Sequence, residues 1–326
     1  MLLVGLNPYG TNYTIGLQGA GRPRANPRPA GLDGFLALAE EMGARSIELD
    51  LRLLPPLDSD DLTRLRDRLE SRGMLPVLSA GPSQETVQEA ILYAKHLGAR
   101  AIRMGLTGVL CGDRAAEPRW LEIVAGARLM LRRMAHIASD HGLSLAIEDH
   151  QDFTSAELIE LCGQAGPGVG ICFDTANPLA VGEEPIAFTR AVASLVRHVH
   201  LKDYRAHWSD VGYRLVSCAT GDGAIPIREM ADILLEHQAE MTASIEVGAL
   251  NARHIRLFTP AWWQGYPPRT AQELAPALAA ARVRRLPDDA EWRTPWELEQ
   301  EPQAIIDHEL ALFRKSVLNV KRIGLM

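Results

Sequence analysis

Short apolar runs alternate with longer segments of helical periodicity along most of the chain. Eight of these runs have the length and composition of buried strands, and a segment with a helical pattern follows each one. The eight runs are residues 2–7, 46–51, 75–80, 101–106, 143–150, 169–175, 196–203 and 243–250. Eight strand–helix units, most of them about 25–30 residues long, predict a (β/α)8 barrel, the TIM-barrel fold.

The signals for individual helices support this division. Residues 117–141 place apolar side chains at three- and four-residue steps, and a segment near 60–72 stops at Gly73. Another helix is expected after Thr154, where Thr-Ser-Ala-Glu has the pattern of a capping box. A doubly wound sheet is the alternative fold. It usually has fewer strands, and GLQGAG at 16–21 does not match the phosphate-binding pattern GxGxxG.

Two regions exceed the minimal barrel. Residues 8–31 are rich in Gly, Pro and Arg and predict a long loop after the first strand. We expect a catalytic barrel over 1–255 and an extension over 256–326 that ends in an amphipathic helix near 298–318. Four of the six tryptophans lie in the extension: Trp262, Trp263, Trp292 and Trp296.

The tryptophans of the extension have two interpretations. Aromatic side chains more often fill cores than bind ligands, so packing on the barrel is the simpler one. Trp262 and Trp263 follow the eighth strand directly, however, and would begin the extension at the catalytic face. They are therefore candidates for contact with a substrate or a partner chain.

Composition restricts the possible functions. The chain has 34 basic and 41 acidic residues, a net charge of −7, which argues against a nucleic-acid-binding surface. No apolar stretch approaches the roughly 20 residues of a membrane-spanning helix, and the N-terminus lacks the pattern of a secretory signal. The four cysteines show no CxxC spacing. We expect a cytoplasmic protein with reduced thiols.

The last four predicted strands each end in a side chain of metal-ligand type. They are Glu148, Asp174, His200 and Glu246. Because the C-terminal ends of barrel strands meet at one mouth, these side chains should converge there. Any one of them alone could be a loop hydrogen-bond acceptor or a helix cap, but three carboxylates at one mouth would repel one another without a cation. Mostly oxygen donors suit Mn²⁺, Mg²⁺ or Co²⁺, so the pattern predicts a single divalent metal ion.

Other ionisable side chains share the strand faces of these ligands. His150 lies two residues beyond the glutamate of its strand and could act as a catalytic base or acid, or be a structural loop histidine. Lys202 lies two residues beyond the histidine of its strand. It could bind a substrate oxygen or form a salt bridge with Asp149 or Asp203. His198 lies one step deeper, where a core role is expected.

The strand ends resemble a known family. IEDH, CFDTAN, HVHLKDY and SIEVG are similar to the metal-binding strands of the xylose-isomerase-like barrel superfamily of sugar isomerases and epimerases. The resemblance runs from the first strand to about residue 250. It implies that Glu148, Asp174, His200 and Glu246 hold the metal, and that the two glutamates can relay protons at a sugar carbon.

A longer signature resembles one branch of this superfamily, the larger subunits of bacterial C-glycoside deglycosidases. It consists of IEDHQDF, HLKDY, GYRLV, GDGAIP and GYPP, with KDYRAH where the epimerases have an ENDR-type run. The resemblance implies β-elimination on a 3-oxo-glycoside, with Mn²⁺ and a small β subunit or a homo-oligomer. The alternative is reversible isomerisation or epimerisation of a ketose or oxo-sugar. Both reactions begin with removal of a proton next to a carbonyl, beside a metal that stabilises the enolate.

Two further classes fit the residues less well. A metal-dependent apurinic endonuclease would need more histidines at the strand ends and a basic face. A sugar-binding barrel without catalytic activity would not need both Glu148 and Glu246 beside Asp174 and His200. The sequence therefore favours a metal-dependent enzyme that acts on a sugar-type substrate.

Overall fold

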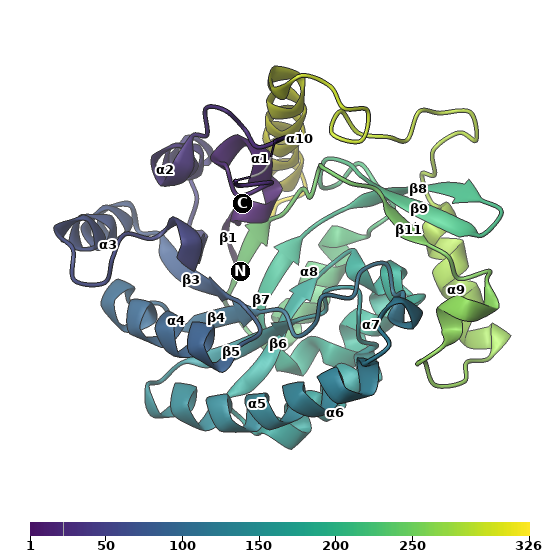
Figure 1. Cartoon of the computed structure of the whole chain (residues 1–326), viewed down its shortest axis with the longest axis horizontal. Coiled ribbons are helices and arrows are strands. Elements are labelled where there is room, and N and C mark those ends of the chain that lie inside the picture. Colours follow the sequence, from purple (N-terminus) through teal and green to yellow (C-terminus); the bar gives the residue numbers. More distant parts are fainter. Residues whose placement is uncertain (22) are drawn as a thin grey trace.

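A computed structural model, which describes residues 1–21 and 23–326, contains a closed barrel of eight parallel strands (Figure 1). The order around the barrel is β1-β10-β7-β6-β5-β4-β3-β2. The strands are β1 (Leu2–Leu6), β2 (Ser46–Asp50), β3 (Leu75–Ala80), β4 (Ala101–Met104), β5 (Ser144–Glu148), β6 (Val169–Asp174), β7 (Val196–Leu201) and β10 (Met241–Ile245). The predicted (β/α)8 barrel is confirmed, and each of the eight predicted runs supplies one strand.

Helices surround the barrel strands (Figure 1). They are α2 (Gly31–Met42), α3 (Asp60–Arg72), α4 (Gln84–Leu97), α5 (Trp120–Asp140), α6 (Ser155–Ala165), α7 (Pro185–Val192) and α8 (Ile227–His237). Helix α3 ends where Gly73 takes the left-handed conformation (φ +63°), which favours glycine. The expected capping box is present at α6, where the Thr154 and Glu157 side chains each accept a hydrogen bond from the other's backbone N–H.

An insertion after β7 forms a small sheet of its own. Strands β8 (Tyr204–Ser209) and β9 (Gly212–Ser217) make an antiparallel hairpin. The short strand β11 (Arg253–Ile255), which follows β10, pairs with β9. This sheet joins two segments that leave the C-terminal ends of neighbouring barrel strands. It therefore fixes the walls of the barrel mouth on that side.

The C-terminal region packs against segments that surround the barrel in two places. Helix α9 (Ala271–Arg282) contacts β8, and α10 (Pro302–Arg322) contacts the short helix α1 (Asn12–Ile15), as Figure 1 shows. Glu309 of α10 is buried and accepts hydrogen bonds from the backbone N–H groups of Tyr13 (3.0 Å) and Thr14 (2.8 Å). Helix α10 thus holds the loop that follows β1.

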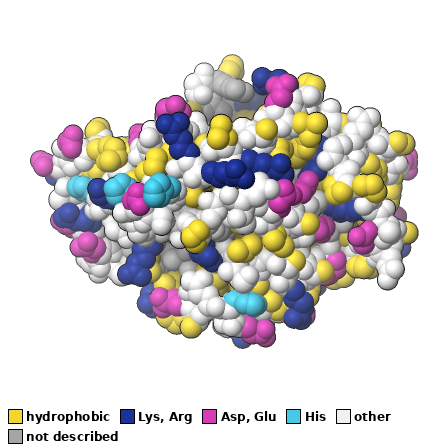
Figure 2. All heavy atoms as spheres, turned by 90° about the horizontal axis from the view of Figure 1, so that it is seen from below, with side chains coloured by type: hydrophobic (Ala, Val, Ile, Leu, Met, Phe, Trp, Pro, Cys, Tyr) yellow, Lys and Arg dark blue, Asp and Glu magenta, His cyan; other side chains and the backbone are white. Residues whose placement is uncertain are grey.

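The surface mixes charges of both signs. Figure 2 shows a face on which basic, acidic and apolar side chains are interspersed. Within residues 1–21 and 23–326, no helix combines the length and apolar character needed to cross a membrane.

Candidate active site

The four predicted metal ligands lie together at the C-terminal end of the barrel. One donor atom from each of Glu148, Asp174, His200 and Glu246 lies within 4.8 Å of the others, and all four residues are buried. Their strands β5, β6, β7 and β10 are consecutive neighbours in the barrel. The side chains converge because each follows an apolar run that anchors its strand in the core, so each strand presents its last polar group at the same level.

The two ring nitrogens of His200 contact different carboxylates. Its Nδ1 atom is 3.0 Å from Glu246 Oε2 and 3.2 Å from Glu148 Oε1. Its Nε2 atom is 2.7 Å from Glu48 Oε2, and His198 Nε2 is 3.2 Å from the same oxygen. An Nε2–H bond to Glu48 orients the ring and leaves Nδ1 to face the other ligands, as carboxylates do behind many metal-binding histidines.

Glu48 was not predicted from the sequence. It lies in the middle of β2, within SIELD, and its side chain is fully buried. A carboxylate in the middle of a buried strand needs a hydrogen-bonding or charged partner, so the position of Glu48 was the sequence signal that could have identified it. Although burial opposes ionisation, His200 and His198 lower the pKa of Glu48 to about 2.

Two cations share the carboxylates of the predicted metal ligands. Lys202 Nζ is 2.6 Å from Asp174 Oδ2 and also pairs with Glu246. Arg103 of β4 pairs with Glu148. Arg103 was also missed by sequence analysis, since an arginine within an apolar run reads equally well as a surface residue.

The partners of Lys202 differ from those expected. Asp149 instead accepts a hydrogen bond from the backbone N–H of Asp174 at 2.6 Å. Asp203 accepts four backbone N–H bonds from its own loop, including those of Gly223 (2.7 Å) and Ile225 (3.0 Å). The expected salt bridge to Asp149 or Asp203 was therefore wrong, because Lys202 pairs with Asp174 and Glu246 instead.

Burial and charge pull the pKa values of these groups in opposite directions. Burial raises the pKa of Asp174 to about 6, against the effect of Lys202. For Glu246 the positive charges of Lys202 and His200 outweigh burial and hold the pKa well below its usual range. Burial also lowers the pKa of His150 to about 4, which leaves a neutral imidazole at neutral pH. Nearby Arg103 and Lys202 act in the same direction, and Glu148 opposes them.

The donor set fits a divalent cation. Three carboxylates and one imidazole are the ligands that Mn²⁺, Mg²⁺ and Co²⁺ accept. Glu148 Oε1 and Glu246 Oε2 both face His200 Nδ1, and these oxygens are not the ones paired with Arg103 and Lys202. The ion pairs therefore leave donor atoms on the side where a metal ion would be held.

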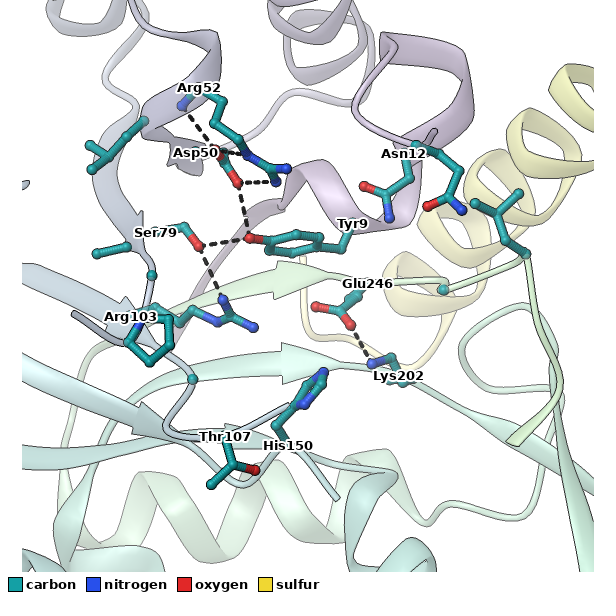
Figure 3. Close-up of a pocket in the computed structure, with 18 of the residues that line it drawn as sticks. Tyr9, Asn12, Asp50, Arg52, Ser79, Arg103, Thr107, His150, Lys202 and Glu246 are labelled. Carbon is teal, nitrogen blue, oxygen red and sulfur yellow. Dashed lines mark hydrogen bonds and ion pairs between the residues drawn. The ribbon is translucent and has the colours of Figure 1, made fainter. Parts of the chain in front are cut away.

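A cavity of about 610 Å³ opens above this cluster (Figure 3). This volume is within the usual range for a small-molecule site. His150, Lys202 and Glu246 point into it from three different strand ends, while Arg103 approaches from the opposite side (Figure 3). The structure thus places the predicted catalytic histidine, the lysine and one metal ligand on one cavity surface.

A hydrogen-bonded group holds the wall opposite Lys202. The Tyr9 hydroxyl is 3.0 Å from Asp50 Oδ2 and 3.2 Å from Ser79 Oγ, and Arg103 donates to Ser79 at 3.2 Å (Figure 3). The Arg103 guanidinium also lies 4.9 Å from the centre of the Tyr9 ring. These contacts fix Arg103 beside the metal ligands.

The two tryptophans predicted to bind substrate lie elsewhere. Trp262 is 1% exposed, donates from Nε1 to the Cys111 carbonyl (2.8 Å) and stacks on Tyr266 at 4.7 Å between ring centres. Trp263 is partly buried and donates to the Leu257 carbonyl (2.8 Å). Neither lines the cavity above the metal ligands. The structure therefore does not bring them to the other site residues.

Comparison with known proteins gives a family match. Residues 36–278 match the family model described as xylose isomerase-like TIM barrel. Three curated relatives align with parts of the chain. The 3-oxo-isoapionate decarboxylase of Pectobacterium atrosepticum is 22% identical over 68% of this chain and 78% of its own length. The inosose dehydratase of Bacillus cereus is 30% identical over 41% of this chain and 50% of its own. The uncharacterized protein YihM of Escherichia coli is 23% identical over 62% of this chain and 61% of its own length.

A solved structure shares the fold over nearly the whole chain. D-psicose 3-epimerase from Clostridium cellulolyticum H10, determined with D-tagatose, superimposes with a TM-score of 0.63. The match covers 98% of this chain and 99% of the epimerase at 12% sequence identity.

Proposed function

Because the chain belongs to the xylose isomerase-like TIM barrel family, we propose that it is a divalent-metal-dependent enzyme acting on a sugar-type substrate. In this proposal it removes a proton from the carbon next to a carbonyl. One observation carries the proposal: four metal-ligand atoms lie within 4.8 Å of one another beneath a cavity that also presents His150. Fold alone would not carry it, because barrels of this kind host many reactions.

The residues that would hold the metal are Glu148, Asp174, His200 and Glu246, with Mn²⁺ the best candidate and Mg²⁺ or Co²⁺ the alternatives. When bound, the cation would act as a Lewis acid that polarises the substrate carbonyl. Glu48 would keep the His200 ring in its orientation from behind. Arg103 and Lys202 would prevent the carboxylates from repelling one another.

His150 is the best candidate for the base. It faces the cavity, and the low pKa of its imidazole leaves it unprotonated at neutral pH, so its ring can accept a proton. Lys202 has three N–H groups, of which two are directed to Asp174 and Glu246. The third can bind a substrate oxygen. Glu246 also reaches the cavity from a different strand end, and its carboxylate is a second acceptor for a proton.

Return of the proton gives isomerisation or epimerisation, and this is the outcome we favour. Its support is that two groups able to accept a proton and then return it, His150 and Glu246, reach the cavity from separate strands, and that the fold matches a 3-epimerase. Elimination is the second candidate, since one curated relative is a dehydratase. Cleavage of a 3-oxo-C-glycoside with the help of a small subunit would be one form of elimination.

Deuterium exchange tests the proposal. Metal-depleted and Mn²⁺-loaded protein would be incubated in D₂O with a panel of ketoses, inososes and 3-oxo-glycosides. We expect deuterium at the carbon next to the carbonyl only with the loaded protein, detected by NMR. Stereoisomers would indicate epimerisation, and release of water or an aglycone would indicate elimination. No exchange with any substrate, or equal exchange without metal, would contradict the proposal.

A further inference from the structure

One cation of the cavity wall is not matched by a carboxylate. In the described part of the chain, the cationic side chains that line the cavity are Arg52, Arg103, Lys202 and Arg253. The first three are each ion-paired with an aspartate or glutamate. Arg253 is half-buried and, among residues 1–21 and 23–326, has no carboxylate oxygen within 4.0 Å and no side-chain hydrogen bond. Its charge is therefore available to a ligand.

The backbone holds Arg253 toward the cavity. It begins β11 and pairs with Leu215 of β9, in a strand where Arg253 and Ile255 point to one side and His254 to the other. His254 packs on Trp292 with ring centres 5.1 Å apart. Arg253 thus lines the same wall as Lys202 and Tyr204, seven residues beyond Glu246.

A second unpartnered group faces the same space. Asn12 lines the cavity from the loop after β1, as Figure 3 shows, and its Oδ1 atom is buried without a hydrogen-bond partner. Buried amide oxygens are normally paired. Of the three carboxylates that line the cavity, Asp50 and Glu246 are paired with Arg52 and Lys202, and the third, Glu89 of α4, is exposed and makes no ion pair with Arg253 within the described chain. The cavity therefore offers one guanidinium and one amide that the protein does not satisfy.

We propose that the substrate carries a carboxylate, which Arg253 binds, and a nearby hydroxyl, which Asn12 accepts. The enzyme would then act on an oxo-sugar acid rather than on a neutral sugar. A guanidinium donates two parallel N–H bonds to the two oxygens of a carboxylate, so a single arginine is enough for this group. The inference rests on the proposed function, because it concerns the substrate of the same cavity.

Binding measurements on matched ligands test this inference. The probes are pairs of the same carbon skeleton with and without the carboxylate: gluconate and glucitol, galactonate and galactitol, and ribonate and ribitol. Each would be titrated calorimetrically into Mn²⁺-saturated protein from which free metal has been removed. We expect at least one acid to bind about 10-fold or more tightly than its alditol, as a charge-assisted hydrogen bond implies.

Three variants make the test specific. Arg253→Gln should lower affinity for the acid about 10- to 100-fold and leave alditol affinity unchanged, since only the charged partner is lost. Arg253→Lys should retain part of the preference. Arg256→Gln is the matched control, because it removes the same charge from an exposed side chain three residues away and outside the cavity. Melting temperatures would verify that all three variants fold.

Several outcomes would overturn the inference. The first is that no acid binds more tightly than its alditol. The second is that the preference for the acid survives in Arg253→Gln because the carboxylate contacts the metal. The third is that the matching sugar phosphates bind more tightly than the acids. Each is distinct from failure of the proposed function. Protein that exchanges deuterium into neutral ketoses without an acid preference would retain that function and remove this inference. Protein that prefers acids but exchanges no deuterium would retain this inference and remove the proposed function.

Discussion

The barrel mouth and the C-terminal extension both contain side chains that proteins use for binding, but the two regions differ in how the polar groups of these side chains find partners. At the mouth, Glu148, Asp174 and Glu246 lie within one small cluster, where like charges repel unless cations join them. In the extension, Trp262 finds a carbonyl for its N–H and an aromatic ring for its face inside the protein. The barrel mouth can therefore gain stability by binding a ligand, whereas Trp262 in the extension already has its contacts within the protein.

The largest expected effect comes from removing the ligands at the mouth. A Glu148→Gln, Asp174→Asn double variant should bind little or no Mn²⁺ and lose essentially all activity, because only one carboxylate and His200 remain. Elemental analysis of dialysed protein measures this directly. Glu183→Gln, which changes a partly buried carboxylate that accepts hydrogen bonds from Ser155 outside the cavity, is the control and should retain the metal. Full metal occupancy in the double variant would sink the assignment.

A smaller effect separates metal binding from proton transfer within the mouth. His150→Ala should lower kcat by about 10²–10⁴-fold, the usual contribution of a general base, with metal content unchanged. The exposed His141, in the turn after α5, gives the matched control, His141→Ala. Near-normal rates in His150→Ala would mean that the histidine is only structural.

The extension should respond in the opposite way. Trp262→Ala should lower the free energy of unfolding by about 3–5 kcal/mol, as large-to-small changes of buried aromatic side chains do, while metal stoichiometry stays normal. Trp263→Ala should cost less, because that side chain is only partly buried. Denaturant titration of both variants measures the difference. A stable Trp262→Ala protein that has lost substrate or partner binding would instead restore the predicted binding role.

The smallest effect concerns the support behind the metal ligands. Glu48→Gln should weaken Mn²⁺ affinity by about 10- to 100-fold without unfolding the protein, since residues that orient ligands typically contribute this much. Competition with a chelating dye measures the dissociation constant. Unchanged affinity would show that the other neighbours of the His200 ring are enough to hold it; they include Cys172, whose Sγ is 3.3 Å from Nε2, and the His198 ring.

The predictable part of this molecule follows from repeated geometry. Eight apolar runs specify eight strands, and the last residues of consecutive strands must meet at one end of the barrel. This is why Glu148, Asp174, His200 and Glu246 could be grouped from sequence alone. No such rule connects Glu48, Arg103 and Arg253 to them. Glu48 and Arg103 lie inside β2 and β4 and not at the strand ends, and Arg253 reaches the mouth only through the pairing of β9 with β11.

The tryptophans of the extension are residues that the sequence placed wrongly. Proximity to β10 in the sequence suggested proximity to the mouth. The chain, however, turns away through β11 and brings Trp262 to the loop that carries Cys111 and Gly112. Segments outside the strand–helix repeat have no fixed direction, so their side chains cannot be placed from spacing.

The central claim is that Glu148, Asp174, His200 and Glu246 form one divalent metal site. Anomalous diffraction at the manganese edge, from crystals grown with Mn²⁺, tests it most directly. We predict one anomalous peak per chain, lying among these four side chains and next to His200 Nδ1. Crystals that diffract well and show no peak there at saturating Mn²⁺, with the carboxylates still ion-paired to Lys202 and Arg103, would contradict the account.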